Sequence, residues 1–540
     1  MTSVAATTAS KRRFGRRERD WRKDTPRLRR SWPSWKPIAL TAFFASSVFS
    51  TLQQGQVAAF SAIAGFLFIG FAMLAVRRPQ FSVMGLVIWV PLQVPILAYA
   101  YKLGAPLILV KQLGYMKEYW EIAILYVALR GKREEHGWRR RSLDRLDMVA
   151  MIYIGLATIY LLLPMAFHGL LGGLTFSGRL DAYRLECVYV VAFLCIRRLQ
   201  LDARFVNEVR NAVMFISVVL AGFAIWESTN STGFNNFLTN TLGYPAFRFA
   251  TTGFHYSNAA NLLDPGNIGS VSFTRAGSLF NDPLTFAFFS LIPFGLALER
   301  LTSERVSPLA LAAAGAAGAS ILLAETRSAV LGAGLAAFVA IAVASRGKPG
   351  RFRFFIVLAA AVVLMLPSAS HSSLKARFEG VFTGTNRDAD SQEHVNATRG
   401  ALHDVLHHPI GRGLGANTTT GVRYHSTNQT TAEDSYLETG EELGLAGGAL
   451  NLLMLCVLLL ELRRRSKRGG VRGELAGGLW LGGLGLVLGG FFLQVWLELV
   501  TSLVFWVLAG VALSEPSDQR SDQALEAEAE QLALLASHGI

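Results

Sequence analysis

The sequence predicts an all-α protein, a polytopic membrane bundle of 12–14 transmembrane helices with two long extracytoplasmic loops. Apolar residues make up 51% of the 540-residue chain, and charged residues make up only 17%, against about 25% in soluble domains. The charges are clustered, and the apolar runs between them have roughly the 17–25 residues that a helix needs to cross a bilayer. Open sheets are excluded, because lipid leaves the backbone groups at their edges without partners.

Fourteen apolar stretches are candidates for these helices. The first is short, and Lys111, Lys117 and Glu118 interrupt the fourth, so that twelve is the lower count. In chain order the stretches lie near 38–54, 57–76, 81–100, 106–129, 147–167, 182–196, 208–226, 282–298, 307–324, 328–344, 353–368, 443–461, 475–492 and 495–513.

The basic residues predict the orientation of these spans. A dense run of Lys and Arg fills the N-terminal tail, and placing this tail in the cytoplasm also places six further basic loops inside, as the positive-inside rule requires. Both termini are then cytoplasmic. Topology also accounts for the net charge of +14 (52 − 38), so we expect no nucleic acid partner. The expected segments are a basic tail (1–37), N-terminal spans (38–226), an outer loop (227–281), central spans (282–368), a larger outer loop (369–442), C-terminal spans (443–514) and an acidic tail (515–540).

Arginines at the expected outer edge of the membrane are exceptions to the positive-inside pattern. Arginine is the preferred residue for bidentate recognition of phosphate, and an ionisable residue at membrane depth is a functional hypothesis by default. The alternative is that each side chain snorkels to the interface or pairs with a neighbouring glutamate. These candidates for anion binding are Arg184, Arg275, Arg327, Arg399 and Arg412.

Two adjacent carboxylates, Glu433 and Asp434, close the larger outer loop just before a span expected to begin near Leu443. A carboxylate at this boundary can act as a general base on an acceptor hydroxyl. Glu441 and Glu442 have a simpler explanation, since a helix N-terminus favours negative charge. His403, His407 and His408 have a spacing that could hold a metal on one helix face. No matching carboxylate ligand accompanies them, which favours a surface role. The three cysteines fall in apolar spans and form neither a disulfide framework nor a zinc motif.

Four segments in order resemble the O-antigen ligase and polymerase superfamily of bacterial membrane glycosyltransferases. They cover about residues 180–515 together with the spans around them. The segments are RAGSLFNDP from Arg275, ETRSAVLG from Glu325, RGALHDVLHHPIGRGLGAN from Arg399, and TAEDSYLETGEELGLAG from Thr431.

The resemblance implies a glycosyltransferase-C-like fold in the cytoplasmic (inner) membrane. It implies transfer of a glycan from undecaprenyl diphosphate to an acceptor glycan or lipid at the outer face, with no metal and no other cofactor. Membrane lipids and other polysaccharide assembly proteins are the further partners that it implies. The five arginines would bind the diphosphate.

The chain departs from the ligase pattern at one position. Glu433 stands where the ligases have histidine and Asp434 where they have asparagine, so His425 would have to substitute from the loop. This departure favours a polymerase of surface polysaccharide repeat units over a ligase onto a lipid or protein acceptor.

Two other classes remain open. A transporter or flippase of lipid-linked oligosaccharide would be expected to place charges at the bilayer midplane and to show inverted repeats, and the sequence shows neither. A structural scaffold for a polysaccharide machine would leave the outer arginines unexplained.

Overall fold

The structure is a computed structural model, which describes residues 70, 74, 76–130, 143–163, 175–252, 265–268, 271–302, 307–344, 389–416 and 432–516. These residues belong to one compact unit, Ile63–Ile540. The expected basic tail, the stretches 38–54 and 353–368, nearly all of 57–76 and nearly all of the acidic tail lie outside the described residues.

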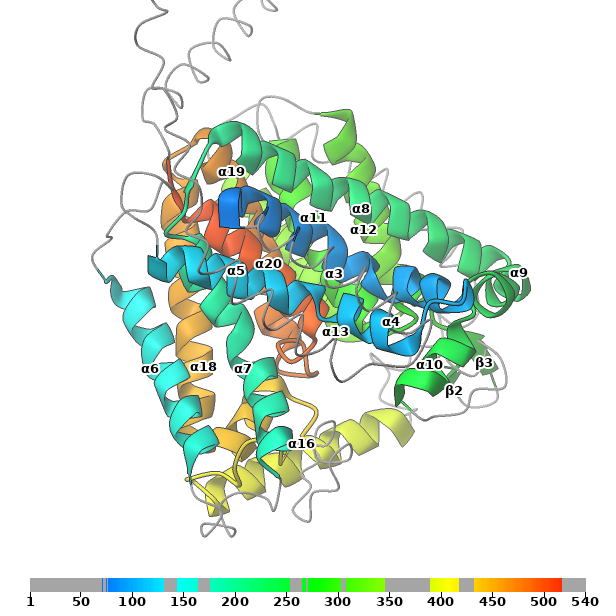
Figure 1. The fold of residues 1–540 in the computed structure, drawn as a ribbon. Helices are drawn as coiled ribbons and strands as arrows, with labels where there is room; N and C mark the ends of the chain where they lie inside the picture. The colour runs from blue at the N-terminus through cyan, green and yellow to red at the C-terminus, as the bar shows by residue number, and fades with distance from the viewer. Residues whose placement is uncertain are drawn as a thin grey trace, which may run out of the picture. The chain divides into compact units, whose positions relative to one another are not determined.

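Helices make up most of the described chain (Figure 1). The first half contains α3 (Pro79–Lys102), α4 (Leu107–Gly114), α5 (Met116–Arg130), α6 (Arg145–Leu162), α7 (Phe176–Ile196), α8 (Ala203–Thr229), α9 (Ser231–Asn236), the π-helical turn η2 (Phe237–Thr241) and α10 (Tyr244–Thr252). The second half contains the 3-10 turn η4 (Ser278–Phe280), α11 (Pro283–Thr302), α12 (Pro308–Leu323), α13 (Arg327–Ala344), α16 (Ala389–His407), α18 (Ser435–Ser466), α19 (Gly470–Gly489) and α20 (Leu499–Ala512). Strands β2 (Pro265–Ile268) and β3 (Val271–Thr274) form an antiparallel hairpin, and β1 (Gln200–Leu201) pairs in parallel with β4 (Glu515–Pro516).

Six helices in the described part of the chain are long and apolar enough to cross a membrane: α3, α6, α8, α11, α18 and α19. Helices α12, α13 and α20 are apolar but shorter. The chain is therefore a multi-pass helical membrane bundle, which confirms the predicted fold class.

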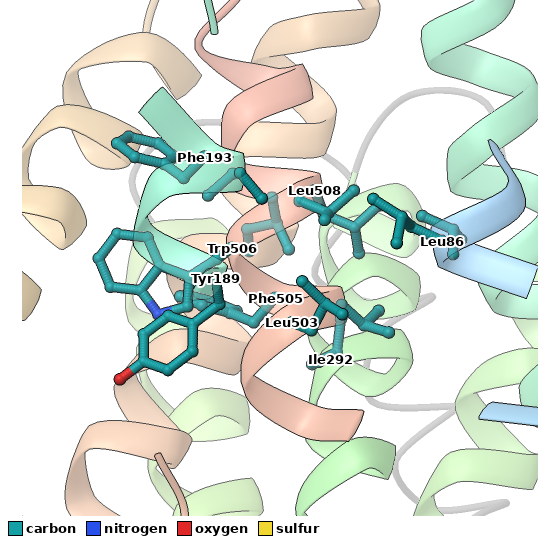
Figure 2. Packing of buried hydrophobic residues seen from close by; sticks show 14 of the residues in the cluster. Leu86, Tyr189, Phe193, Ile292, Leu503, Phe505, Trp506 and Leu508 are labelled. Atoms are coloured by element: carbon teal, nitrogen blue, oxygen red, sulfur yellow. The ribbon is translucent and has the colours of Figure 1, made fainter. Parts of the chain in front are cut away.

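Helix α20 lies at the centre of the hydrophobic core (Figure 2). Its Trp506 ring lies 5.2 Å from the Phe193 ring and 5.8 Å from the Tyr189 ring, both on α7. Helices α3 and α11 also pack against α20, with Leu86 and Ile292 in the same buried cluster. The stretch expected near 495–513 is thus enclosed by other helices.

Glycines let α19 approach its neighbours closely. A Cβ atom on Gly295 of α11 would collide with the backbone of Gly482, and one on Gly332 of α13 would collide with Gly485. Small residues at helix interfaces allow the backbones to approach closely. The van der Waals contacts that result help to drive the association of helices surrounded by lipid. The glycine-rich sequence of α19 therefore specifies its position between α11 and α13.

Polar residues set where several helices begin. Asp144 and Asp147 form a reciprocal capping box at the start of α6, and Asp202 and Ser307 cap α8 and α12. Asp144 and Asp147 also form ion pairs with Arg197, whose side chain is fully buried. Helix starts and buried ion pairs are thus built from the same side chains at this end of α6.

The observed elements differ from the expected ones in four places, one of which is helix α16 within the expected outer loop 369–442. The stretch near 106–129 is divided at Tyr115 into α4 and α5. The expected outer loop 227–281 contains the end of α8, then α9, η2, α10 and the β2–β3 hairpin. Helix α18 begins at Ser435, earlier than the expected start near Leu443, because Asp434 provides a helix cap that hydrophobicity alone does not indicate.

Candidate functional site

A break in α18 shapes the candidate site. Gly444 has φ 75° and ψ 177°, a conformation that is essentially restricted to glycine. The break separates a short leading segment, Ser435 to Leu443, from the long apolar part of the helix. It also frees the carbonyls of Glu441 and Glu442, which accept hydrogen bonds from the backbone nitrogens of Arg412 (2.6 Å) and Gly413 (3.0 Å).

Loop 408–416, which follows α16, packs tightly against the break in α18. Leu445 donates its backbone N–H to the Pro409 carbonyl at 2.9 Å. A Cβ atom on Gly411 would collide with the Gly444 nitrogen, and one on Gly444 would collide with the Pro409 carbonyl. The two glycines therefore specify the register between loop 408–416 and the break in α18.

Glu433 lies just before α18 and contacts His394 on α16. The Nδ1 atom of His394 and the Oε2 atom of Glu433 are hydrogen-bonded, and both side chains remain partly open to solvent. Ala401 and Val405 are buried on the same face of α16, Val405 against Gly440, and they hold the helix on the leading segment of α18. The structure thus presents a carboxylate–imidazole pair at this end of the bundle.

His394 was missed in the sequence reasoning. It lies 39 residues from Glu433 in the chain, in a segment without an apolar span. The signal that could have indicated it is its place on the α16 face that also carries Ala401 and Val405, since residues seven and eleven positions apart share one face of a helix.

Asp434 has a different environment from Glu433. Its Oδ1 atom accepts hydrogen bonds from the backbone nitrogens of Tyr436 (2.8 Å) and Leu437 (3.0 Å), so it caps α18. The side chain is buried. Burial raises the pKa of Asp434, and the two backbone hydrogen bonds act in the opposite direction.

Glu441 and Glu442 do not lie at the helix start, where the sequence had suggested them. Because α18 begins at Ser435, only Glu438 falls in its first turn, and all three glutamates are buried. Glu438 is fully enclosed, and among the described residues neither of its carboxylate oxygens has a hydrogen-bond partner.

Arg275 contacts the turn between α12 and α13, which immediately precedes Arg327. Arg275 donates from Nε to the Ala324 carbonyl at 3.2 Å and from a terminal nitrogen to the Thr326 hydroxyl at 3.0 Å. Arg327 is the first residue of α13 and is half-buried. The Arg275 guanidinium therefore lies beside the N-terminus of α13, whose first residue is Arg327, and this combination is suited to binding an anion.

The other three arginines have separate surroundings. Arg184 pairs with Glu118 and Asp181, each at 2.8 Å. Arg412 forms a bidentate pair with Asp404, which holds the pKa of that carboxyl below its usual value. Arg399 is exposed on α16. His425 lies outside the described residues.

Segment 490–498 lies between the start of α18 and the start of α11, which follows Arg275 in the chain. Gln494 donates to the Ala432 carbonyl (2.9 Å), next to Glu433, and Ser435 donates its backbone N–H to the Gly490 carbonyl (3.0 Å). At the other end of the segment, the Thr285 hydroxyl contacts both Glu498, at 2.9 Å, and Asp282. One hydroxyl hydrogen serves only one acceptor, so this arrangement favours a proton on one of the two carboxyls.

The comparisons with known proteins agree with the sequence motifs. Residues 312–452 match the family model described as O-antigen ligase, and no curated protein matches the chain. The match confirms the resemblance to the O-antigen ligase and polymerase superfamily and supports that general type of glycosyl transfer. It includes Arg327, Arg399, Arg412, Glu433, Asp434 and the newly identified His394.

Proposed function

We propose that this membrane protein, of the O-antigen ligase and polymerase type by its residues 312–452, transfers a glycan from an undecaprenyl diphosphate carrier to an acceptor hydroxyl. The reaction would take place at the outer face of the cytoplasmic membrane, with both termini in the cytoplasm. The observation that carries this proposal is the pairing of Glu433 with His394 in the same unit as the Arg275–Arg327 turn.

The arginine turn suits the leaving group of such a donor. When the bond between the sugar and the diphosphate breaks, negative charge develops on the diphosphate oxygens. Fixed guanidinium groups and the N-terminus of α13 would stabilise that charge without having to reorganise. Arg275 is held by the Ala324 carbonyl and the Thr326 hydroxyl, so its orientation is set before the substrate binds.

The carboxylate–imidazole pair suits the acceptor. The acceptor oxygen attacks the anomeric carbon, the bond to the diphosphate oxygen breaks, and the hydroxyl proton must pass to a base. With Nδ1 of His394 hydrogen-bonded to Glu433, Nε2 is the ring nitrogen that would accept that proton, while Glu433 would orient the ring and stabilise its charged form. Glu433 thus remains in the proposed site, with His394 as the group that it orients.

We favour polymerisation of surface polysaccharide repeat units over ligation. Glu433 occupies the position where the ligase pattern has histidine, and the histidine of this protein comes from α16 instead. The imidazole therefore approaches from a different element, which changes the space available to the acceptor.

A reconstitution experiment tests the proposal. The purified protein is placed in proteoliposomes with undecaprenyl-diphosphate-linked repeat units, and the products are separated by chain length. A ladder of longer chains that remain on the carrier supports a polymerase. Transfer only to a lipid or protein acceptor supports the ligase alternative. Movement of the donor across the membrane with no new glycosidic bond would overturn the proposed function and favour a flippase.

A further inference from the structure

Helix α16 is not among the helices that could span the membrane, and its surface has three distinct faces. One face carries His394, Ala401 and Val405 and packs on α18. A second, polar face carries Gly400, His403 and His407, all exposed. A soluble amphipathic helix needs only one apolar face, so the composition of the third face requires a separate explanation.

The third face is apolar and exposed. It carries Val395, Leu402 and Leu406, the last with 62% of its surface accessible, and these positions recur at the spacing of one helix face. Arg399 lies among them and is also exposed. We refer to Val395, Arg399, Leu402 and Leu406 as the apolar edge of α16.

The apolar edge is continuous with a surface that must face lipid. Ile410 follows the edge in the chain and is 61% exposed, and its neighbour Pro409 is hydrogen-bonded to Leu445, which is 54% exposed at the start of the long apolar part of α18. Tyr160, near the end of the membrane span α6, donates its hydroxyl to the Ile410 carbonyl. Figure 1 shows α16 crossing the end of α18, against which it packs.

We propose that α16 is an interfacial helix whose apolar edge inserts into the headgroup region of the bilayer in which the protein is embedded. An interfacial helix buries its apolar face at the boundary of headgroups and acyl chains, with basic residues beside it. Arg399 then lies at the level of the lipid phosphates, where its stem contacts acyl chains and its guanidinium contacts an anionic headgroup. That this end faces outward rests on the proposed function, whereas the contact with lipid does not.

This position has a consequence for the donor. A polyprenyl diphosphate presents its phosphates at the same depth as those of the surrounding lipids. Arg399 and His394 lie on different faces of α16, the first towards lipid and the second towards Glu433. The helix therefore places one cationic group where a lipid-linked substrate approaches and the carboxylate–imidazole pair where it would react.

Depth-dependent fluorescence quenching tests the proposal without any assay of activity. Single cysteines are introduced at Val395, Leu402 and Leu406 and labelled with bimane in a Cys456→Ala background, in which the two remaining cysteines, Cys187 and Cys195, are buried. The protein is reconstituted in phosphatidylethanolamine–phosphatidylglycerol vesicles with or without acyl-brominated lipid. The matched control is Gly400→Cys, because an added side chain there meets no atom within 4 Å.

We expect brominated lipid to quench the edge labels severalfold more than the Gly400 label, and aqueous iodide to show the reverse order. Three edge positions are used so that one poorly folding variant does not decide the result. Equal quenching by lipid at the edge and at Gly400 would overturn the proposal. Edge labels that neither lipid nor iodide reaches would also overturn it, because protein would then cover the edge.

Discussion

Glu433 and Asp434 are neighbours in the chain, but their side chains have opposite surroundings. Glu433 is partly exposed and faces an imidazole, whereas Asp434 is buried and binds two backbone N–H groups. The first arrangement suits proton transfer and the second suits helix capping. We therefore expect substitutions at the two positions to have different effects.

Asp434→Asn should retain most of the transfer activity, because asparagine caps a helix about as well as aspartate. Asp434→Ala should destabilise the protein by about 1 kcal/mol through loss of the cap. The initial rate of transfer measures the first effect, and thermal unfolding in detergent measures the second. If Asp434→Asn abolished transfer in a stable protein, Asp434 would belong to the reacting groups instead.

The stability of the protein should also depend on pH through Asp434. Burial raises the pKa of Asp434 above its value in the unfolded chain, which is about 3.9. The folded protein therefore binds this proton more tightly, and the stabilisation that results is present below the unfolded pKa and is lost as the pH rises through the folded pKa. Asp434→Asn should remove this contribution, which is visible as a flatter dependence of the unfolding temperature on pH.

Arg327→Lys should lower the transfer rate about 10–100-fold, because lysine keeps the charge but loses the planar fork, and a hydrogen bond to a charged group contributes about 1.5–3 kcal/mol. The measurement is the initial rate in proteoliposomes at equal protein amounts. Arg204→Lys is a matched control, since Arg204 lies in an exposed pair with Glu208. Full activity of Arg327→Lys would remove Arg327 from the site.

At the scale of elements, the break in α18 determines the geometry of the site. The leading segment carries Asp434 at its start, and the freed carbonyls of Glu441 and Glu442 hold the loop that follows α16. An unbroken helix would satisfy those carbonyls internally and release the loop. The position of His394 relative to Glu433 therefore depends on Gly444.

Gly444→Ala should destabilise the protein by about 1–3 kcal/mol, the cost of holding a residue with a side chain in this backbone conformation, and the added Cβ would also collide with Pro409. Transfer activity should fall together with stability. Gly334→Ala is the matched control, because an added Cβ there meets no atom within 4 Å on helix α13. An unfolding temperature for Gly444→Ala equal to that of the unchanged protein would contradict this role of the break.

The sequence predicted the individual elements better than their ends. Apolar runs indicated most of the described membrane helices, because the hydrophobic thickness of a bilayer constrains their length. The apolar runs did not indicate the start of α18 at Ser435, which depends on a cap. They also did not indicate α16, which is weakly amphipathic and packs against the bundle on only one of its three faces. The cap at Asp434 is a local feature that apolar runs do not reveal, whereas the packing of α16 depends on tertiary contacts that a local pattern does not contain.

The sequence indicated only part of the candidate site, because one of its residues is recognisable only from a tertiary contact. Arg275, Arg327 and Glu433 stood out because charge at a membrane edge is unusual. His394 did not, because its significance comes from contact with a residue 39 positions away. Residues 490–498, which contact Ala432 at one end and Thr285 at the other, carry none of the motifs noted in the sequence.

At the scale of the whole molecule, the helical bundle holds two sets of groups with complementary chemistry. The Arg275–Arg327 turn provides positive charge for a leaving diphosphate, and the His394–Glu433 pair provides a base for an acceptor hydroxyl. The core around α20 and the glycine contacts of α19 keep the helices that carry them in place. The central claim is that His394 and Glu433 act together in glycan transfer.

A double-mutant cycle on the reconstituted protein tests this claim most directly. The rate of glycan transfer is measured for His394→Gln, Glu433→Gln and the double variant, with His403→Gln on the polar face of α16 as the control. We predict a loss of about 10²–10⁴-fold for His394→Gln, a smaller or equal loss for Glu433→Gln, and no further loss in the double variant, since groups that act as a unit are not additive. Activity of His394→Gln equal to that of His403→Gln would contradict the account.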